Sequence, residues 1–207
     1  MNNDKVGLIY APLCALSPTP WGWIHPNGGI IADREEPELR AMANAGANCV
    51  RLLALAPWLQ DGEINPAKVW APFKVGSTGR FSLREFEGSY FDAMWMLAND
   101  ANKCGMALWI DLFDHCGRNH PNSPWVTNEE GISDYASERA DQYTRAYIRQ
   151  MVEALKGRDV IFGWGNEFRD RDETEFCLRV VAPTLKECGV PWEKQAYGGD
   201  NLFREPC

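Results

Sequence analysis

The sequence predicts an α/β protein built on a parallel sheet, an incomplete (β/α)8 TIM barrel with about five βα units in this chain. Short runs that are apolar on both faces alternate with helical patterns, as in a parallel sheet covered by helices. Long segments follow the runs, whereas the connections after the helices are short. A barrel builds its active-site face from the loops after its strands. A doubly wound open sheet is the alternative, although no GxGxxG or P-loop follows a predicted strand.

The predicted strands are short apolar runs, and the helices between them show a helical period. The strands are expected over residues 6–13, 48–55, 106–113, 160–164 and 194–197. The apolar positions of the four helices are Leu39, Met42 and Ala43; Phe91, Met94, Trp95 and Ala98; Tyr143, Tyr147, Met151 and Leu155; and Phe176, Val180, Val181 and Leu185. The glycines that close these helices are Gly46, Gly105, Gly157 and Gly189.

Length and composition limit the class of protein. No linker, repeat or low-complexity tract divides the 207 residues, so residues 1–207 are expected to form a single partial barrel domain with the catalytic face, although a full barrel typically needs about 250 residues. The net charge of −8 and the lack of a basic run argue against nucleic acid as a partner. Seven cysteines without a CxxC pair indicate neither a disulfide framework nor a structural zinc site, and no cofactor is expected.

The N-terminal segment is interpreted as a strand and not as a signal peptide. Residues 1–5 lack the positive charge of a leader, and Pro12 interrupts the apolar stretch that follows. No run approaches the roughly 20 apolar residues of a membrane span, so no membrane partner is expected. The sequence leaves the cellular location undetermined, although the irregular cysteine spacing favours a reducing compartment such as the cytoplasm.

The strongest chemical signal is the end of the fourth predicted strand, where Asn166 and Glu167 follow an apolar run. A glycosidase needs a carboxylic acid that protonates the leaving oxygen, and a polar neighbour that binds the 2-hydroxyl group of the sugar. Glu167 and Asn166 match these two requirements. Taken alone, the pair is equally explained by a solvent-exposed Asn-Glu at a strand end.

Two further segments occur in the order found in one enzyme family: GANCVR at residues 46–51 and GRFSL at residues 79–83, the latter followed by Tyr90-Phe91. Together with the Asn166-Glu167 strand end, they make the sequence resemble clan A of the glycoside hydrolases, the cellulase-like or 4/7 superfamily. In that family the acid/base glutamate follows an asparagine at the end of strand four. The resemblance runs over roughly residues 6–200, which correspond to the first five βα units.

The resemblance implies roles for five polar residues. Glu167 would be the general acid/base, and Asn166 and Arg51 would orient the substrate and the nucleophilic carboxylate. Arg51 interrupts an otherwise apolar strand, and a guanidinium favours ionisation of a nearby acid; the alternative is an arginine bonded to backbone carbonyls. His115 would contact sugar, and Asp114 beside it is included with the substrate-binding residues.

Aromatic side chains are the second group of candidate substrate contacts, because an indole can stack on a pyranose ring. The tryptophans in segments that follow strands are Trp21, Trp23, Trp58 and Trp125. Aromatic residues pack in cores more often than they bind ligands, but the neighbouring prolines and glycines favour at least one sugar platform here. The tryptophans assigned to packing are Trp95, Trp109 and Trp164.

A cluster after the third predicted strand allows a different chemistry. Its members are Asp111, Asp114, His115, Cys116 and His120. Aspartate and histidine are suitable metal ligands, so a metal-dependent barrel hydrolase is a third hypothesis. The cluster lacks an HxH or HExxH spacing, and we do not expect a metal site.

A retaining glycosidase also needs a second carboxyl group about 5 to 5.5 Å from the first, and in clan A this nucleophile lies at the end of strand seven. Five predicted strands leave no seventh, so the resemblance predicts that the nucleophile is missing and that the chain alone is inactive. The alternative function is a non-catalytic glycan-binding or assembly module of the same fold. Either function implies an oligosaccharide or polysaccharide as partner, and the unpaired first and fifth strands predict self-association through open barrel edges.

Overall fold

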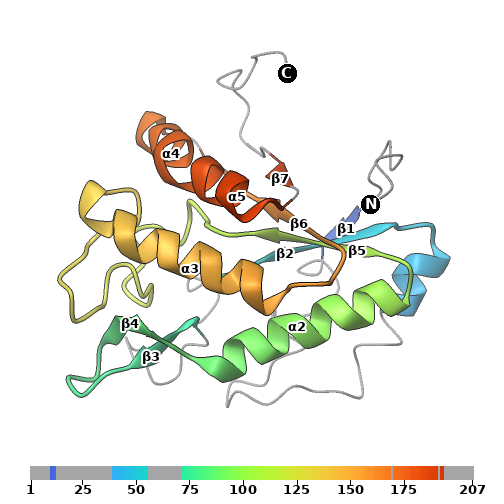
Figure 1. Ribbon diagram of the computed structural model, residues 1–207, viewed down its shortest axis with the longest axis horizontal. Coiled ribbons are helices and arrows are strands. Elements are labelled where there is room, and N and C mark those ends of the chain that lie inside the picture. Colours follow the sequence, from blue (N-terminus) through green and yellow to red (C-terminus); the bar gives the residue numbers. More distant parts are fainter. Residues whose placement is uncertain (1–9, 13–38, 56–70, 169, 191, 194–207) are drawn as a thin grey trace.

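A parallel five-stranded sheet forms the centre of the structure (Figure 1). The computed structural model describes residues 10–12, 39–55, 71–168, 170–190 and 192–193. The strands of the sheet are β1 (Tyr10–Pro12), β2 (Cys49–Leu53), β5 (Ala107–Asp111), β6 (Val160–Gly163) and β7 (Trp192–Glu193). Their spatial order is β1-β2-β5-β6-β7, and every neighbouring pair is parallel.

The strand order distinguishes between the two folds that the sequence allows. Crossovers between parallel strands are right-handed, so strands that are always added at the same edge leave their helices on one face of the sheet. A doubly wound sheet instead reverses its order at a switch point. The strands of the described residues follow one another without reversal. This part of the chain is therefore singly wound, as the strands of a (β/α)8 barrel are.

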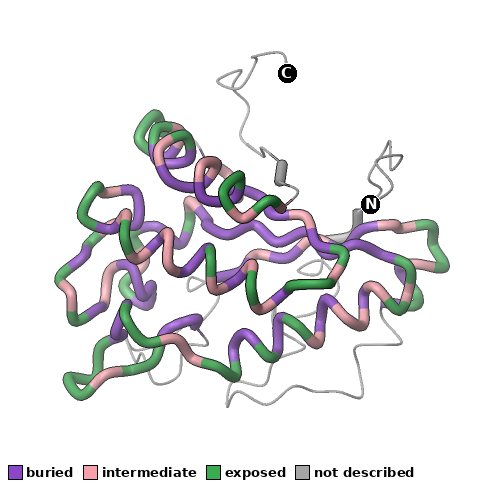
Figure 2. Tube along the Cα trace, in the orientation of Figure 1, coloured by how far each residue is buried: buried purple, intermediate pink, exposed green. Residues whose placement is uncertain are grey.

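Helices cover the sheet, and α3 lies between α2 and the α4–α5 segment (Figure 1). The helical elements are α2 (Gly88–Lys103), the 3-10 turn η4 (Glu138–Ala140), α3 (Asp141–Ala154), α4 (Arg171–Phe176), the π-helical turn η5 (Cys177–Val181) and α5 (Ala182–Cys188). Residues 39–44 are also helical and bury Leu39 and Met42. Figure 2 shows the helices exposed along their outer sides and buried toward the strands. No described helix has the length and apolar character needed to cross a membrane.

The two faces of the sheet have different surroundings because side chains alternate along a strand. Val50, Leu108 and Phe162 belong to the large core that the helices help to form. The alternate positions Ala107 and Trp109 pack in a separate small cluster with Cys49. Since Arg51 and Asp111 follow the same alternation, their side chains start from the face turned away from the helices.

A two-stranded antiparallel hairpin, which the sequence analysis did not predict, precedes α2. It consists of β3 (Phe73–Val75) and β4 (Phe81–Phe86). The ring of Phe73 lies against those of Phe86 and Trp125, with centroid distances of 5.6 and 5.2 Å. The hairpin therefore extends the hydrophobic core beyond the main sheet. It also includes part of the GRFSL segment, which lies on β4 shortly before α2.

Two predictions about elements need correction. The fifth strand runs over Trp192–Glu193, earlier than the predicted residues 194–197, which lie outside the described residues. Trp95 is 38% exposed and does not pack in the core. Its indole instead lies under the guanidinium of Arg158, 4.8 Å from the ring centroid, on the outer side of α2. The other four strands of the sheet lie within their predicted ranges: β1, β2, β5 and β6.

The close packing beside Gly163 at the end of β6 gives a test of this arrangement. A Cβ atom at Gly163 would overlap the carboxylate of Asp111 and lie 2.5 Å from Nε1 of Trp109. We predict that Gly163→Ala lowers the free energy of unfolding by about 1–3 kcal/mol, the usual cost of overpacking, as measured by urea denaturation.

Gly88→Ala is the matched control for this substitution. Gly88 is the first residue of α2, and an added Cβ would meet no atom within 4 Å. Alanine also has the higher helix propensity, so Gly88→Ala is expected to be neutral or stabilising. Equal effects of the two substitutions would show that the end of β6 does not lie against Asp111 and Trp109.

Candidate active site

One arginine joins the ends of three strands. The Nε atom of Arg51, on β2, donates to Oδ2 of Asp111, on β5, at 2.6 Å. Its Nη2 atom donates to Oδ1 of Asn166, beyond the end of β6, at 2.8 Å. A guanidinium presents several donors in a rigid fork, so it fixes both partners at once. The structure therefore brings together the three residues in a cross-strand network, and Arg51 is not bonded only to backbone carbonyls.

The side-chain amide of Asn166 is held at both ends. While its oxygen accepts from Arg51, its Nδ2 donates to Oδ1 of Asp114 at 2.8 Å. The backbone is held as well, because Asn166 N donates to the carbonyl of Phe113 at 2.9 Å and its carbonyl accepts from His115 N at 3.0 Å. A guanidinium can only donate and a carboxylate can only accept, so these two partners determine which way the amide faces.

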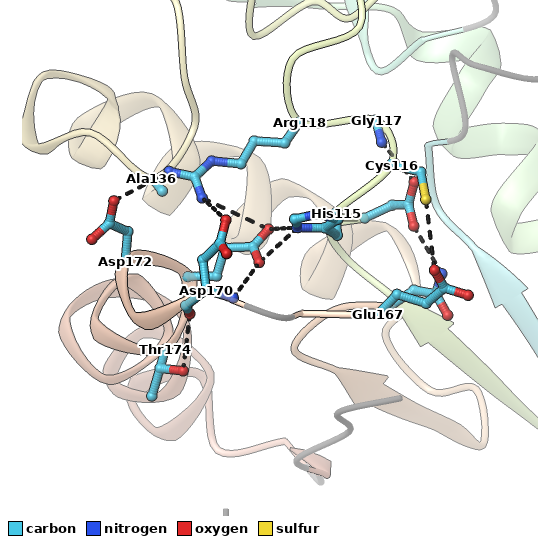
Figure 3. Close-up of polar contacts among 12 residues, drawn as sticks. His115, Cys116, Gly117, Arg118, Ala136, Glu167, Asp170, Asp172 and Thr174 are labelled. Carbon is cyan, nitrogen blue, oxygen red and sulfur yellow. Dashed lines mark hydrogen bonds and ion pairs between the residues drawn. The ribbon is translucent and has the colours of Figure 1, made fainter. Parts of the chain in front are cut away.

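Glu167 has an unusual backbone conformation. Its φ is +54°, and among the described residues it is the one non-glycine residue with positive φ. A side chain in the left-handed region costs about 1–3 kcal/mol, and such residues concentrate at functional sites. The carboxylate is half-buried, and its Oε2 accepts a hydrogen bond from the thiol of Cys116 at 3.6 Å (Figure 3). The position predicted for the acid/base therefore carries backbone strain.

Asp111 is the most deeply buried carboxylate at the strand ends, with 1% of its surface exposed. Burial raises the pKa of Asp111 from 3.8 to about 6, because the charged form loses its hydration. The charge of Arg51 acts in the opposite direction, as does the hydrogen bond from Nε1 of Trp109, which reaches Oδ1 at 3.0 Å. Arg51 therefore stabilises a charge that its surroundings disfavour.

The ring of His115 is turned toward α4 and away from Glu167 (Figure 3). Its Nδ1 lies 2.9 and 3.0 Å from the two carboxylate oxygens of Glu173, a residue with no exposed surface. Glu173 also accepts from the hydroxyl of Tyr135 at 3.0 Å and from the backbone N of Asp170 at 3.3 Å. The imidazole therefore ties the loop after β5 to the start of α4, which the sequence did not predict.

Glu173 was not predicted as a site residue, although a capping pattern in the sequence indicates its place at the start of a helix. Asp170 and Glu173 have the spacing of a capping box, and the structure contains that box at the start of α4. A capping box predicts a partly exposed glutamate at a helix end. Nothing in the local pattern indicates that the same carboxylate would also bind His115 and Tyr135, because those contacts span 58 and 38 residues of sequence.

The residues of the metal hypothesis have separate partners. Asp111 is bonded to Arg51, Asp114 to Asn166 and His115 to Glu173, while Nδ1 of His120 accepts from Asn122 N at 3.2 Å. A different group, in which donor atoms lie within 4.8 Å of one another, consists of His115, Asp170 and Glu173. Nη1 of Arg118 lies 3.5 Å from Asp170 and 4.0 Å from Glu173. A guanidinium thus already supplies positive charge beside this group.

The tryptophan candidates divide into two groups. Trp125 is 3% exposed, and its ring packs 6.0 Å from those of Phe113 and Tyr147, so the prediction that it offers a sugar platform is wrong. It joins the aromatic core because the β3–β4 hairpin covers it. The remaining candidates lie outside the described residues: Trp21, Trp23 and Trp58.

Comparison with known proteins adds evidence about the fold. No protein-family model matches the sequence, and no curated protein matches it. Among solved structures, GH5_18 from Bifidobacterium longum subsp. infantis is similar over 92% of this chain and 43% of its own, with a TM-score of 0.59 and 14% identity. GH5_18 from Bifidobacterium longum subsp. longum is similar over 86% and 40%, with a TM-score of 0.55 and 16% identity. A glycoside hydrolase family 5 protein from Bacteroides vulgatus is similar over 84% and 33%, with a TM-score of 0.52 and 16% identity.

The fold is clan A glycoside hydrolase-like. The resemblance seen in the sequence is thus confirmed at the level of fold. The chain spans less than half the length of each of these three structures. Identities of 14–16% carry the similarity of fold alone.

The Arg51–Asp111 pair predicts a pH-dependent effect of Arg51→Met. The folded-state pKa of Asp111, about 6, lies above its ordinary value of 3.8, so this group makes the wild-type protein less stable as pH rises from about 4 to about 6. Removing Arg51 leaves a buried carboxylate without its cation, which costs about 3–5 kcal/mol when the carboxylate is charged. Urea denaturation should show this loss at pH 7.5 and a smaller loss at pH 5, where Asp111 holds a proton in both proteins.

Arg171→Met is the control for the loss of an arginine from an ion pair. Arg171 pairs with Glu175 at the surface of α4, where its side chain is 88% exposed. Exposed pairs contribute about 0–1 kcal/mol, so this variant should stay close to the wild type at both pH values. A pH-independent loss in Arg51→Met would contradict the assignment of the raised pKa to Asp111.

The left-handed backbone of Glu167 predicts that glycine is the better replacement there. Relative to Glu167→Ala, Glu167→Gly should raise the free energy of unfolding by roughly 1 kcal/mol, because glycine adopts positive φ without steric cost. Both variants lose the carboxylate, so that loss cancels. At the exposed helical position Glu153 the order should reverse, with glycine less stable than alanine by about 0.5–1 kcal/mol. The same order at both positions, measured by urea denaturation, would exclude the strained conformation.

Proposed function

We propose that this chain is part of a retaining glycoside hydrolase for β-linked glycans, in which Glu167 is the general acid/base. The observation that carries the proposal is the strand end itself. Asn166 is held by Arg51 and Asp114, and it leads directly into a glutamate whose backbone is in the left-handed region. Strained residues persist where the surrounding structure fixes them, and catalytic groups are among them.

The proposed roles follow from the chemistry of each group. Glu167 would protonate the glycosidic oxygen as the bond to the leaving sugar breaks, and would then take a proton from the water that completes the reaction. Asn166 would bind a sugar hydroxyl. Its bonds to Arg51 and Asp114 use one lone pair of Oδ1 and one hydrogen of Nδ2, and an amide has a second of each.

Arg51 is proposed as a positioning residue. Its contacts are with Asp111 and Asn166, so it would act on the substrate through the amide that it orients. The nucleophile of the retaining mechanism is not assigned to a described residue. By the family resemblance it belongs to strand seven, and we propose that sequence outside these five βα units supplies it.

The proposed substrate class is a β-linked oligosaccharide or polysaccharide. A GH5_18 variant from Bifidobacterium longum subsp. longum, similar in fold with a TM-score of 0.57, has been crystallised in complex with Manb1-4GlcNAc. That ligand belongs to the neighbouring protein. It provides a useful first member of a test panel, beside β-1,4-linked glucan and mannan oligosaccharides.

Substitution of Glu167 tests the acid/base assignment in the full natural chain. Glu167→Gln should lower kcat/KM on oligosaccharides, which have poor leaving groups, by about 10²–10⁴-fold, the usual contribution of a general acid. With a 2,4-dinitrophenyl β-glycoside the loss should be much smaller for bond cleavage, because that leaving group needs no proton. Azide should restore turnover of Glu167→Ala and give a β-glycosyl azide, since azide needs no general base.

Two controls make the outcome specific. Glu175→Gln alters an exposed glutamate of α4 that pairs with Arg171, and it should leave both substrates unaffected. A 2-deoxy-2-fluoro β-glycoside should trap the glycosyl-enzyme, and mass spectrometry of its peptides then identifies the nucleophile. Undiminished hydrolysis of oligosaccharides by Glu167→Gln would rule out Glu167 as the acid. Calorimetric binding of oligosaccharides without turnover by any form of the protein would instead favour the glycan-binding alternative.

A further inference from the structure

Cys116 is the residue of the loop after β5 whose side chain meets Glu167. Its thiol lies 3.6 Å from Oε2 of Glu167 and is exposed to solvent (Figure 3). In the sequence, Cys116 belongs to a group of neighbouring aspartates and histidines, and no function of its own is predicted for it. Neither the fold nor the proposed acid/base role of Glu167 requires a thiol at this position.

The loop holds Cys116 in place from both sides. Before it, His115 N donates to the carbonyl of Asn166 at 3.0 Å, and the His115 ring is bound by the buried carboxylate of Glu173. After it, Gly117 N donates to Oδ2 of Asp114 at 2.8 Å. Asp114 also binds Asn166, so the loop and the Asn166-Glu167 strand end are tied together. These contacts fix the backbone on both sides of Cys116 relative to Glu167.

We propose that Cys116 is a positioning residue for Glu167, in which the thiol holds Oε2 of the carboxylate and so orients the group that donates the proton. This inference rests on the proposed function of Glu167. A thiol is a weak donor, and the hydrogen bond exists with the ionised carboxylate as acceptor. The thiol therefore restrains the orientation of the Glu167 carboxylate.

The pairing also works in the other direction. The negative charge of Glu167 opposes formation of a thiolate at Cys116, because two like charges 3.6 Å apart repel each other. The reactivity of the thiol therefore reports on the carboxylate beside it. This readout needs no catalytic activity, so it separates the pairing of Cys116 with Glu167 from the proposed hydrolase function.

The first experiment measures alkylation of Cys116 by iodoacetamide at pH 7.5, resolved by mass spectrometry of peptides. The thiolate is the reactive form, so Glu167→Gln should increase the rate at Cys116 by about five- to ten-fold. The half-buried thiols of Cys104 and Cys188 serve as internal references, whose rates should not change. An unchanged rate at Cys116 in Glu167→Gln would overturn the proposal, whether or not the protein hydrolyses glycans.

The second experiment uses the active enzyme and distinguishes a positioning role of Cys116 from a purely structural one. Cys116→Ala removes the donor, so kcat on oligosaccharides should fall by about three- to ten-fold while KM changes little, because only the orientation of Glu167 is lost. Cys116→Ser keeps a donor at the same place and should restore the wild-type kcat. Urea denaturation checks that both variants fold. An unchanged kcat in Cys116→Ala, or an equal loss in both variants, would overturn the proposal.

Discussion

The guanidinium of Arg51 is the constraint on which the strand ends depend. Its side chain is 11% exposed and binds Asp111, whose side chain has no exposed surface. Each charge is therefore tolerated only because the other is present. The same guanidinium reaches Asn166, and thereby sets the distance between the ends of β2, β5 and β6. A sheet held by its backbone alone would fix the strands but not the polar groups beyond them. Arg51 also fixes the side chains of Asp111 and Asn166, which lie at the strand ends where the chemistry is proposed.

Close packing explains why glycines occur at two positions at the end of β6. A side chain at Gly163 would overlap Asp111, and one at Gly165 would overlap the ring of Phe168. Two residues after Gly165, Glu167 takes a left-handed conformation. Such strain persists only where the surroundings determine the backbone, and here the backbone N and O of the preceding Asn166 are both bonded to the loop after β5.

The sequence could predict features that depend on neighbours along the chain. Apolar runs of the right length located β2, β5 and β6, and the helical period located the buried faces of α2 and α3, because both signals are local. It could not predict that Trp125 is buried, since Phe73 of the covering hairpin lies 52 residues earlier in the sequence. The contacts of Glu173 could not be predicted for the same reason, because their partners are also distant in the sequence. The roles of Asn166 and Glu167 come from the resemblance and not from the local pattern, and they stay predictions.

Exposure distinguishes among the carboxylates at the ends of β5 and β6. Asp111 and Asp114 are 1% and 3% exposed, and each is bound by donors of the protein, Arg51 and Trp109 for the first and Asn166 and Gly117 N for the second. A general acid must reach an oxygen of the substrate, which a buried and bonded carboxylate cannot do. Glu167 is half-buried and shares its Oε2 with an exposed thiol. Of these three carboxylates, Glu167 is therefore the one whose exposure suits the proposed role of general acid.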